Sequence, residues 1–270
     1  MPSTLRIPLA ARAHGDALFP QVAIGDVHAR AWLDAIGDDG QDWLDDRPSV
    51  YGVLARTRVF RERALDYLAR HPAGQVVNLG CGLSHYFQWL DNGRCRMVEG
   101  DLEEVVAIRR QLPGGGPDGR RHRLAVLDIG QPGWWDRLGL APDRQGAPVF
   151  LMCEGVLMYL PPATVRGILA EFGARAPAGS VFVFDALSGL ASGNARLHAS
   201  VRHTAAEFSW GPLRIAELTA PHGRLQLEAV HMVMEGYDPL YAVMGHSFRL
   251  FMGVPFYALY ELHAQHAAGG

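Results

Sequence analysis

Residues 76–82 read Val-Val-Asn-Leu-Gly-Cys-Gly, and this stretch decides the fold. A short apolar run that stops at Gly80 and Gly82 predicts a strand passing into a tight turn, because glycine lets the backbone approach a ligand closely. A dinucleotide-binding turn has a third glycine, which allows the next helix to pack closely on the strand. This sequence has His85 at that position, which weakens a pyrophosphate-binding interpretation.

Further apolar runs follow along the chain. They occupy residues 95–98, 123–127, 148–153, 181–184, 225–234 and 256–263. Continuous apolar runs separated by helical segments are typical of parallel strands that are buried on both faces. We expect helices over 50–70, where His71-Pro72 ends the helical spacing, and over 161–176. The pattern predicts an α/β fold with a mostly parallel sheet of seven strands.

Four of these runs end in an acidic residue, namely Asp101, Asp128, Glu154 and Asp185. Because the carboxyl ends of parallel strands line the ligand crevice of an open sheet, these side chains predict a polar crevice. Glu99 and Asp101 both follow the glycine turn at a distance suited to accepting hydrogen bonds from ribose hydroxyls. We also expect Asp101 to be the N-cap of a helix, with Glu104 completing a capping box.

Composition narrows the classes of function. The 270 residues include 25 Lys plus Arg and 28 Asp plus Glu, which argues against a dedicated nucleic-acid binder. Cys81, Cys95 and Cys153 have no paired CxxC spacing, so we expect neither a metal site nor a disulfide framework. No signal peptide or membrane span is visible, and we expect a cytoplasmic protein. The oligomeric state stays open.

Four motifs resemble the leucine carboxyl methyltransferase superfamily, and within it the bacterial tetracenomycin-type O-methyltransferases. They are Ala-Arg-Thr-Arg at 55–58, the glycine motif at 77–83, Gly-Asp-Leu at 100–102 and Glu-Gly-Val-Leu-Met-Tyr-Leu at 154–160. Residues 7–12 fit more loosely. The resemblance implies a Rossmann-like class I methyltransferase fold that uses S-adenosyl-L-methionine, which has no pyrophosphate. It also implies O-methylation of a small molecule, such as a polyketide or another secondary metabolite.

The resemblance also implies roles for individual residues. Arg56 pairs with the methionyl carboxylate, and Glu154 lies near the methionyl amine. The other implied cofactor contacts are Gly80 for the methionyl part, Asp101 for the ribose, and Asp128 with the backbone of Ile129 for the adenine. Asn78 and Gly82 are further candidate cofactor-binding residues. Tyr159 reaches toward the substrate as a candidate catalytic residue.

This chain departs from the family pattern at two places. Relatives usually have Asp-Thr-Arg after the glycine motif, whereas this chain has Ser84-His85-Tyr86. Relatives usually have Leu-Pro after the ribose acid, whereas this chain has Leu102-Glu103. The first departure touches the cofactor pocket.

Within a single methyltransferase domain we expect four regions. Residues 1–72 form an N-terminal helical region, 73–187 the cofactor-binding core, 188–222 a helical cap and 223–270 the C-terminal strands. The cap should order or tighten when substrate binds, because methyl-transfer sites must exclude water.

The expected cap contains the candidate acceptor-binding residues. His198 and His203 are the candidate bases for a hydroxyl acceptor, since a phenol with a pKa near 10 is scarcely ionised at neutral pH. Arg196 and Arg202 could instead hold an anionic acceptor. The concentration of positive charge predicts an acceptor with a carboxylate, although the sequence does not exclude a hydroxyl.

Three alternatives stay open at this point. A nicotinamide-dependent oxidoreductase would share the sheet but should have the third glycine. A catalytically silent relative would keep the fold and act as a binding module. An enzyme that binds adenosylmethionine but runs non-methylating chemistry is compatible with the altered residues 84–86.

Overall fold

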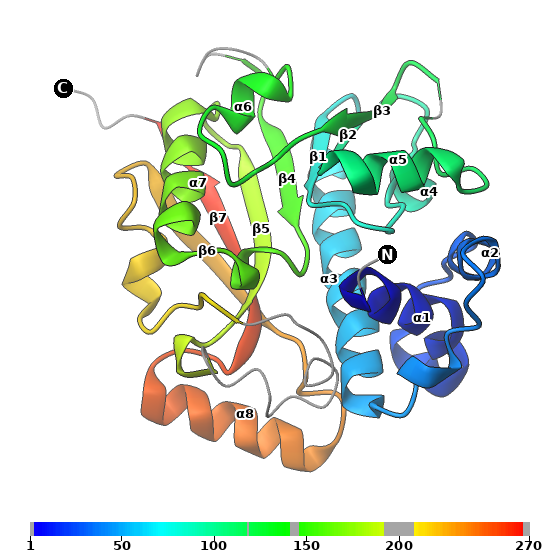
Figure 1. Cartoon of the computed structure of the whole chain (residues 1–270). Helices are drawn as coiled ribbons and strands as arrows, with labels where there is room; N and C mark the ends of the chain where they lie inside the picture. The colour runs from blue at the N-terminus through cyan, green and yellow to red at the C-terminus, as the bar shows by residue number, and fades with distance from the viewer. Residues whose placement is uncertain (1–2, 118, 141–145, 192–207, 267–270) are drawn as a thin grey trace.

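The computed structural model describes residues 3–117, 119–140, 146–191 and 208–266, which form one seven-stranded sheet with helices on both faces (Figure 1). The strand order is β3-β2-β1-β4-β5-β7-β6. The strands are β1 Gln75–Leu79, β2 Arg96–Asp101, β3 His122–Val126, β4 Val149–Cys153, β5 Val181–Leu187, β6 Leu225–Met232 and β7 Tyr257–Ala264. Strands β1 to β5 are parallel, and β7 is antiparallel to both of its neighbours. The predicted α/β fold with seven mostly parallel strands is confirmed.

The α-helices occur mainly between strands and in the first 70 residues. They are α1 Ser3–Leu18, α2 Ala29–Ala35, α3 Arg47–Arg70, α4 Phe87–Leu90, α5 Glu103–Gln111, α6 Trp134–Arg137, α7 Pro162–Arg175 and α8 Pro239–Met252. Asp46 caps α3 by accepting hydrogen bonds from the amide and hydroxyl of Ser49. Helix α3 ends at Arg70, with His71 as its C-cap immediately before Pro72, as predicted.

Two apolar cores lie on opposite faces of the sheet. Strand β4 shows why, because Phe150 and Met152 join the core on the α3 side while Leu151 and Cys153 join the core on the α7 side. Every residue of β4 is therefore buried. This burial on both faces explains the continuous apolar run in the sequence.

The carboxyl ends of β1, β2, β4 and β5 lie at one edge of the sheet, the lower edge in Figure 1. Strand β7 enters the sheet from the same edge because it runs the opposite way. Its first residue, Tyr257, pairs with Leu187 at the end of β5. Residues from the last tenth of the chain thus lie beside the strand ends that were predicted to line a crevice.

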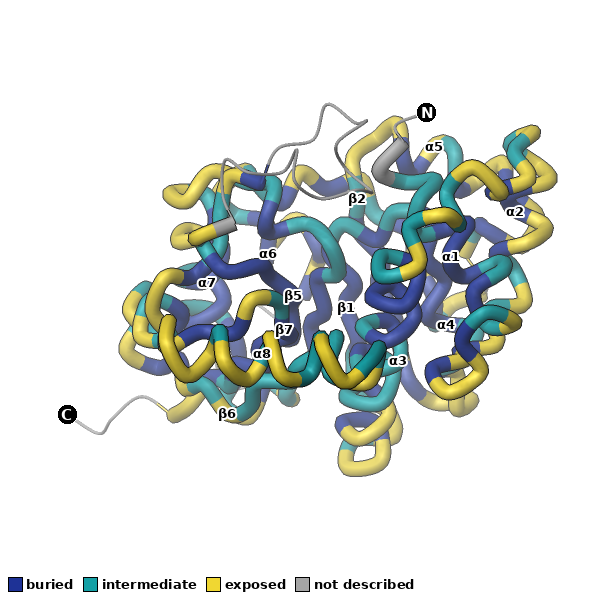
Figure 2. Tube along the Cα trace, turned by 90° about the horizontal axis from the view of Figure 1, so that it is seen from below, coloured by how far each residue is buried: buried dark blue, intermediate teal, exposed yellow. Residues whose placement is uncertain are grey.

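Helix α8 was not predicted, since residues 223–270 were expected to form strands only. It lies along the lower edge of the sheet in Figure 1, and Figure 2 shows it without a single buried residue. Its most exposed apolar side chains are Leu250 at 80% and Phe251 at 78%, with Leu240, Val243, Met244 and Met252 at 50% or more. No described helix combines the length and apolar character that crossing a bilayer requires.

Two local expectations have different outcomes. The capping box at Asp101 is wrong by one residue: Leu102 is the N-cap of α5, without a side-chain cap. Residues 192–207 of the predicted cap lie outside the described part of the chain. Arg196, His198, Arg202 and His203 lie there too. On either side of this segment the chain forms short 3-10 turns at Gly189–Ala191 and Ile215–Leu218.

Candidate active site

The glycine turn after β1 is held by the end of β2. Gly80 and Gly82 have φ angles of 66° and 51°, in the left-handed region that favours glycine. A Cβ atom at Gly80 would lie 2.5 Å from a methyl group of Val156, so this position has no room for a side chain. The amide of Gly82 donates a 2.6 Å hydrogen bond to Oδ2 of Asp101. The predicted site residues Gly80, Gly82 and Asp101 therefore form one unit.

Asn78 and Ser84 stiffen this turn from within. The Asn78 amide donates to Oγ of Ser84 at 3.2 Å, and the Ser84 hydroxyl donates to the carbonyl of Cys81 at 2.7 Å. Asn78 is buried, and its Oδ1 atom has no hydrogen-bond partner among the described residues. An unsatisfied buried acceptor beside a glycine turn suits a ligand that has an N–H or O–H donor.

Asp101 lies at the carboxyl end of β2 with both oxygens in use. Besides the bond from Gly82, its Oδ1 accepts from the amide of Leu102 at 2.8 Å. Burial raises the pKa of Asp101, although the two amides and Arg109 oppose the change. Each carboxylate oxygen has a second lone pair, so this side chain can still accept hydrogen bonds from two hydroxyl groups.

Glu99, the alternative ribose acid, lies elsewhere. Its side chain is fully buried and pairs with Arg109 at 2.6 Å and with Nε2 of His122 at 2.8 Å. Burial alone would raise the pKa of Glu99, but Arg109 and the histidine hydrogen bonds lower it well below its ordinary value. Glu99 is therefore a buried ion-pair partner and is not available to a ribose in this arrangement.

Arg56, on α3, lies between the ends of β4 and β5. Its Nε atom donates to Oε1 of Glu154 at 2.9 Å, and its Nη1 atom donates to Oδ2 of Asp185 at 3.4 Å and to the hydroxyl of Tyr257 at 3.3 Å. The Nη2 atom makes no hydrogen bond to a described residue. Gly155 packs against this guanidinium, since a Cβ there would lie 3.0 Å from Nη2. Arg56 and Glu154, which were predicted to bind two ends of one ligand group, are in direct contact.

The pKa values of the two acids beside Arg56 are shifted in opposite directions. Burial would raise the pKa of Glu154, but Arg56, Arg12 and the hydrogen bonds from Tyr86 and Arg56 lower it. Burial raises the pKa of Asp185, and there Arg56 and the hydrogen bonds from Gly155 and Tyr257 only partly oppose it. With both acids ionised, Arg56 faces two negative charges.

Three further side chains complete this network, and the sequence did not single them out for it. The Tyr86 hydroxyl donates to Oε2 of Glu154 at 2.6 Å, and the Thr57 hydroxyl donates to Oε1 at 3.0 Å. The Tyr257 hydroxyl donates to Oδ2 of Asp185 at 2.6 Å. Tyr86 belongs to the departure at 84–86 and Thr57 follows Arg56, so both had a signal nearby. Nothing in the sequence pointed to Tyr257.

Asp128 and Ile129 lie after β3, farther along the same edge. Asp128 is exposed, and its side chain accepts from the amide of Gly130 at 2.8 Å and from the Gln131 side chain at 3.3 Å. Ile129 is buried in the core on the α7 side. Asp128 therefore caps its own turn and keeps a solvent-facing carboxylate.

Tyr159 lies in the short 3-10 turn Leu157–Tyr159 after β4. Its ring stacks on Phe208 with centroids 5.4 Å apart, and the backbone of Met158 accepts hydrogen bonds from Ser209 and Trp210. Met158, Leu187 and Phe208 form a small apolar cluster against which Tyr159 and Tyr257 pack. The carboxyl edge thus combines buried charges with an aromatic wall, which consists of Tyr159, Phe208 and Tyr257.

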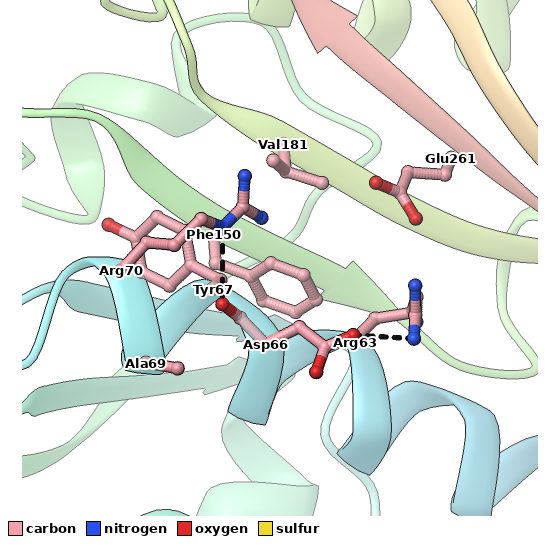
Figure 3. A pocket seen from close by; sticks show the side chains of 8 residues that line it. All are labelled: Arg63, Asp66, Tyr67, Ala69, Arg70, Phe150, Val181 and Glu261. Carbon is pink, nitrogen blue, oxygen red and sulfur yellow. Dashed lines mark hydrogen bonds and ion pairs between the residues drawn. The ribbon is translucent and has the colours of Figure 1, made fainter.

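A separate cavity of about 340 Å³ lies against the carboxyl-terminal half of α3 (Figure 3). It is lined by Arg63, Asp66, Tyr67, Ala69, Arg70, Phe150, Val181 and Glu261. Val181 is the first residue of β5, so this cavity lies toward the amino edge of the sheet, away from the glycine turn.

The described residues suit adenosylmethionine. The two left-handed glycines leave the turn without side chains, and Asp101 offers a carboxylate to hydroxyl groups. Among the described residues, neither Nη2 of Arg56 nor Oδ1 of Asn78 has a hydrogen-bond partner. The first suits a carboxylate and the second a donor, which are the groups at the two ends of a zwitterionic methionyl group.

The sequence and the fold are similar to those of known methyltransferases. The chain is 28% identical over 209 residues to the tetracenomycin polyketide synthesis O-methyltransferase TcmP of Streptomyces glaucescens, which covers 77% of this chain and 74% of that protein. The fold of this chain is similar to that of magnesium protoporphyrin IX methyltransferase from Synechocystis PCC 6803 with bound S-adenosylhomocysteine. The TM-score is 0.52, with 11% identity, over 94% of this chain and 100% of that one.

The family model for leucine carboxyl methyltransferases matches residues 6–173. That range contains α3, the glycine turn, Asp101 and the Glu154–Leu160 run, whereas Asp185 and Tyr257 lie beyond it. The chain therefore belongs to the leucine carboxyl methyltransferase family, and its cofactor is S-adenosylmethionine.

Proposed function

We propose that this protein is an O-methyltransferase that acts on a carboxylate or hydroxyl group of a small molecule with an aromatic body. The observation that carries the proposal is the aromatic wall of Tyr159, Phe208 and Tyr257 beside the buried charges at the carboxyl edge. The curated relative TcmP is an O-methyltransferase of polyketide synthesis, which supports the same reaction class.

Bound adenosylmethionine supplies a methyl group on a positively charged sulfur, ready for in-line displacement. The chain's own residues have to bind and orient the cofactor and the acceptor and to exclude water, because positioning supplies most of the catalysis in such a reaction. In this proposal Asp101 accepts the ribose hydroxyls, while Arg56 and Glu154 hold the methionyl carboxylate and amine. Asp128 and the backbone of Ile129 hold the adenine edge.

The aromatic wall orients the acceptor. Stacked rings favour a flat apolar body, since aromatic pairs add attraction beyond the area that they bury. The pKa of the Tyr159 hydroxyl is raised by burial, so Tyr159 is protonated at neutral pH and can donate a hydrogen bond to the acceptor. It serves as an orienting group in this proposal.

The net charge at the carboxyl edge of the sheet affects which kind of acceptor can bind. Asp101, Glu154 and Asp185 together outnumber Arg56, so a carboxylate acceptor needs further positive charge to dock. Arg196, His198, Arg202 and His203 are the residues that we propose for this purpose, on the basis of sequence alone. A hydroxyl acceptor would instead need one of the two histidines as a base.

One experiment separates these possibilities. The purified protein is incubated with methyl-labelled adenosylmethionine and a panel of aromatic acids and phenols, and the products are treated with mild alkali. Esters release methanol, whereas aryl ethers keep the label. For a carboxylate acceptor, His203→Ala should mainly raise the acceptor KM; for a phenol it should lower kcat by roughly a hundredfold or more.

Consumption of adenosylmethionine without any methylated acceptor, with the label recovered on a product derived from the cofactor, would favour non-methylating chemistry instead. Calorimetry that detects no heat with adenosylmethionine or adenosylhomocysteine would contradict the proposal outright, since the expected affinity is micromolar. Nothing in the family assignment supports the nicotinamide-dependent alternative.

A further inference from the structure

Arg109, on α5, is completely buried beneath the glycine turn. Its Nη1 atom donates to the carbonyl of Ser84 at 2.5 Å and to that of Gly82 at 3.3 Å, and its Nε atom donates to the carbonyl of Gly115 at 3.3 Å. One guanidinium thus joins the turn after β1 to the segment that follows α5.

Gly82 is held from two directions. Its amide donates to Asp101 and its carbonyl accepts from Arg109, so both backbone polar groups of Gly82 are fixed. Arg109 is fixed in turn by Glu99, whose Oε2 atom lies 2.6 Å from Nη2. Glu99 and Asp101 both belong to β2, so one strand anchors the turn through a direct contact and through Arg109.

The altered residues 84 and 85 take part in this arrangement. Ser84 supplies the carbonyl at the shorter distance from Arg109. The ring of His85 lies against the ring of His28, with centroids 4.5 Å apart, and its Nδ1 atom is 3.9 Å from Oε2 of Glu99. The guanidinium of Arg109 stacks over Trp32, with its carbon 4.9 Å from the ring centroid. Trp32 of α2 and His28, which precedes α2, therefore cover the cluster of Arg109, Glu99 and His85.

A metal ion is the competing explanation for this cluster. His85, Glu99 and His122 each offer one ligand atom, and these atoms lie within 4.8 Å of one another. Two buried atoms there, Nδ1 of His85 and Oε1 of Glu99, have no hydrogen-bond partner among the described residues. However, Arg109 already neutralises Glu99, so a divalent cation would add two uncompensated charges to a fully buried site. The charges favour the ion pair.

We propose that Arg109 is a positioning residue for cofactor binding, which sets the glycine turn in its binding conformation through the carbonyls of Gly82 and Ser84. A turn that is ordered beforehand loses less conformational freedom when the ligand binds, so its affinity is higher. The inference rests on the turn being the adenosylmethionine site, but not on the identity of the acceptor.

The test measures adenosylhomocysteine binding by calorimetry together with the thermal midpoint of unfolding. Removing Arg109 alone would leave the buried carboxylate of Glu99 without the guanidinium that neutralises it and could unfold the protein. The informative variant is therefore the double substitution Arg109→Met with Glu99→Gln, which removes both charges. Arg109→Lys, which keeps the charge but loses the planar fork, is the conservative partner.

Arg224 provides a matched control. It is also buried, and it also donates to backbone carbonyls, those of Gly173, Ala176 and Gln265, far from the turn. Arg224→Met should lower the thermal midpoint without changing the dissociation constant. Arg109→Met/Glu99→Gln should raise the dissociation constant tenfold or more, and Arg109→Lys should fall between it and the wild type. The turn amides at 81–84 should exchange faster with solvent in the double variant alone.

The inference is overturned if the folded double variant binds within twofold of the wild type, or if Arg224→Met weakens binding equally. Stoichiometric zinc in the purified wild type, with binding lost on chelation, would replace the ion pair by a metal site. Because no acceptor is present in these measurements, a failure of the proposed O-methylation leaves their result unaffected.

Discussion

The hydroxyl of Tyr86 donates a 2.6 Å hydrogen bond to Oε2 of Glu154 and so links the segment after the glycine turn to the end of β4. Tyr86 occupies a position at which relatives usually have arginine. In this chain Glu154 therefore has a neutral donor, Tyr86, and a charged one, Arg56, in direct contact with its carboxylate.

Tyr86→Phe should therefore weaken cofactor binding as well as stability. The lost bond goes to an ionised group, so the expected cost is about 1.5–3 kcal/mol of unfolding free energy, and the pKa of Glu154 should rise. Calorimetry with adenosylhomocysteine and thermal unfolding measure the two effects. Tyr67→Phe is the control, because Tyr67 donates to the carbonyl of Pro148 away from the site. Equal affinities in the two variants would mean that Tyr86 has only a structural role.

Asp101→Ala should reduce cofactor affinity by about 1.5–3 kcal/mol, since it removes hydrogen bonds to an ionised acceptor. Burial raises the pKa of Asp101, so this carboxylate becomes protonated at a higher pH than an exposed aspartate does. As the pH falls, the wild type should therefore begin to lose cofactor affinity above the usual pKa of an aspartate. Asp101→Asn should bind weakly and lack this pH dependence. Calorimetry over a pH series provides the check, and an unchanged pH profile in Asp101→Asn would show that another group titrates.

Tyr159 should act on the acceptor and not on the cofactor. Tyr159→Phe keeps the stacking on Phe208, whereas Tyr159→Ala removes the ring. The alanine variant should raise the acceptor KM roughly tenfold, since an aromatic contact and its buried area are lost together. Both variants should bind adenosylhomocysteine as the wild type does. A change in cofactor affinity with an unchanged acceptor KM would show that Tyr159 acts on the cofactor and not on the acceptor.

Glu261, on β7, should contribute to stability against acid. Burial would raise its pKa, but hydrogen bonds from His231 and His263 outweigh this and lower the pKa to about 2. A folded-state pKa below the ordinary value of 4.5 means that the contribution is present above that value and is lost as the pH falls toward 2. Glu261→Gln should therefore be less stable than the wild type near pH 6, with a difference that shrinks toward pH 2.

Glu228→Gln is the control for that series, because Glu228 is exposed on the neighbouring strand β6. Chemical unfolding at each pH gives the free energies. A constant difference between Glu261→Gln and the wild type from pH 6 to pH 2 would contradict the assignment of the acid sensitivity to this carboxylate.

The sequence predicted the centre of the sheet well because the central strands are buried on both faces. Strands such as β4 and β5 appear as unbroken apolar runs, and each is followed by a clear stop signal. Helix α8 has no such signature. The helix contains Leu240, Leu250 and Phe251, but none of its residues is buried, so it belongs to neither core.

The site was predictable only where a motif carried it. Arg56, Glu154 and Asp101 occur in motifs, but the sequence could not show that Arg56 and Glu154 touch. Glu99 and Asp101 looked equivalent because strand residues two apart point to the same face. The difference lies in the neighbours: Arg109 and His122 bury Glu99, whereas Asp101 stands at the strand end where the turn begins.

The antiparallel entry of β7 has a consequence for how the site is made. Arg56 and Tyr257 are 201 residues apart in the sequence, yet they share a hydrogen bond. During synthesis Arg56, Glu154 and Asp185 all leave the ribosome long before the strand that must insert between β5 and β6. Contacts between such distant residues form slowly, because a long loop must close first. A nascent chain can therefore assemble the glycine turn early, but it gains the Tyr257 side of the acceptor wall only when the sheet is complete.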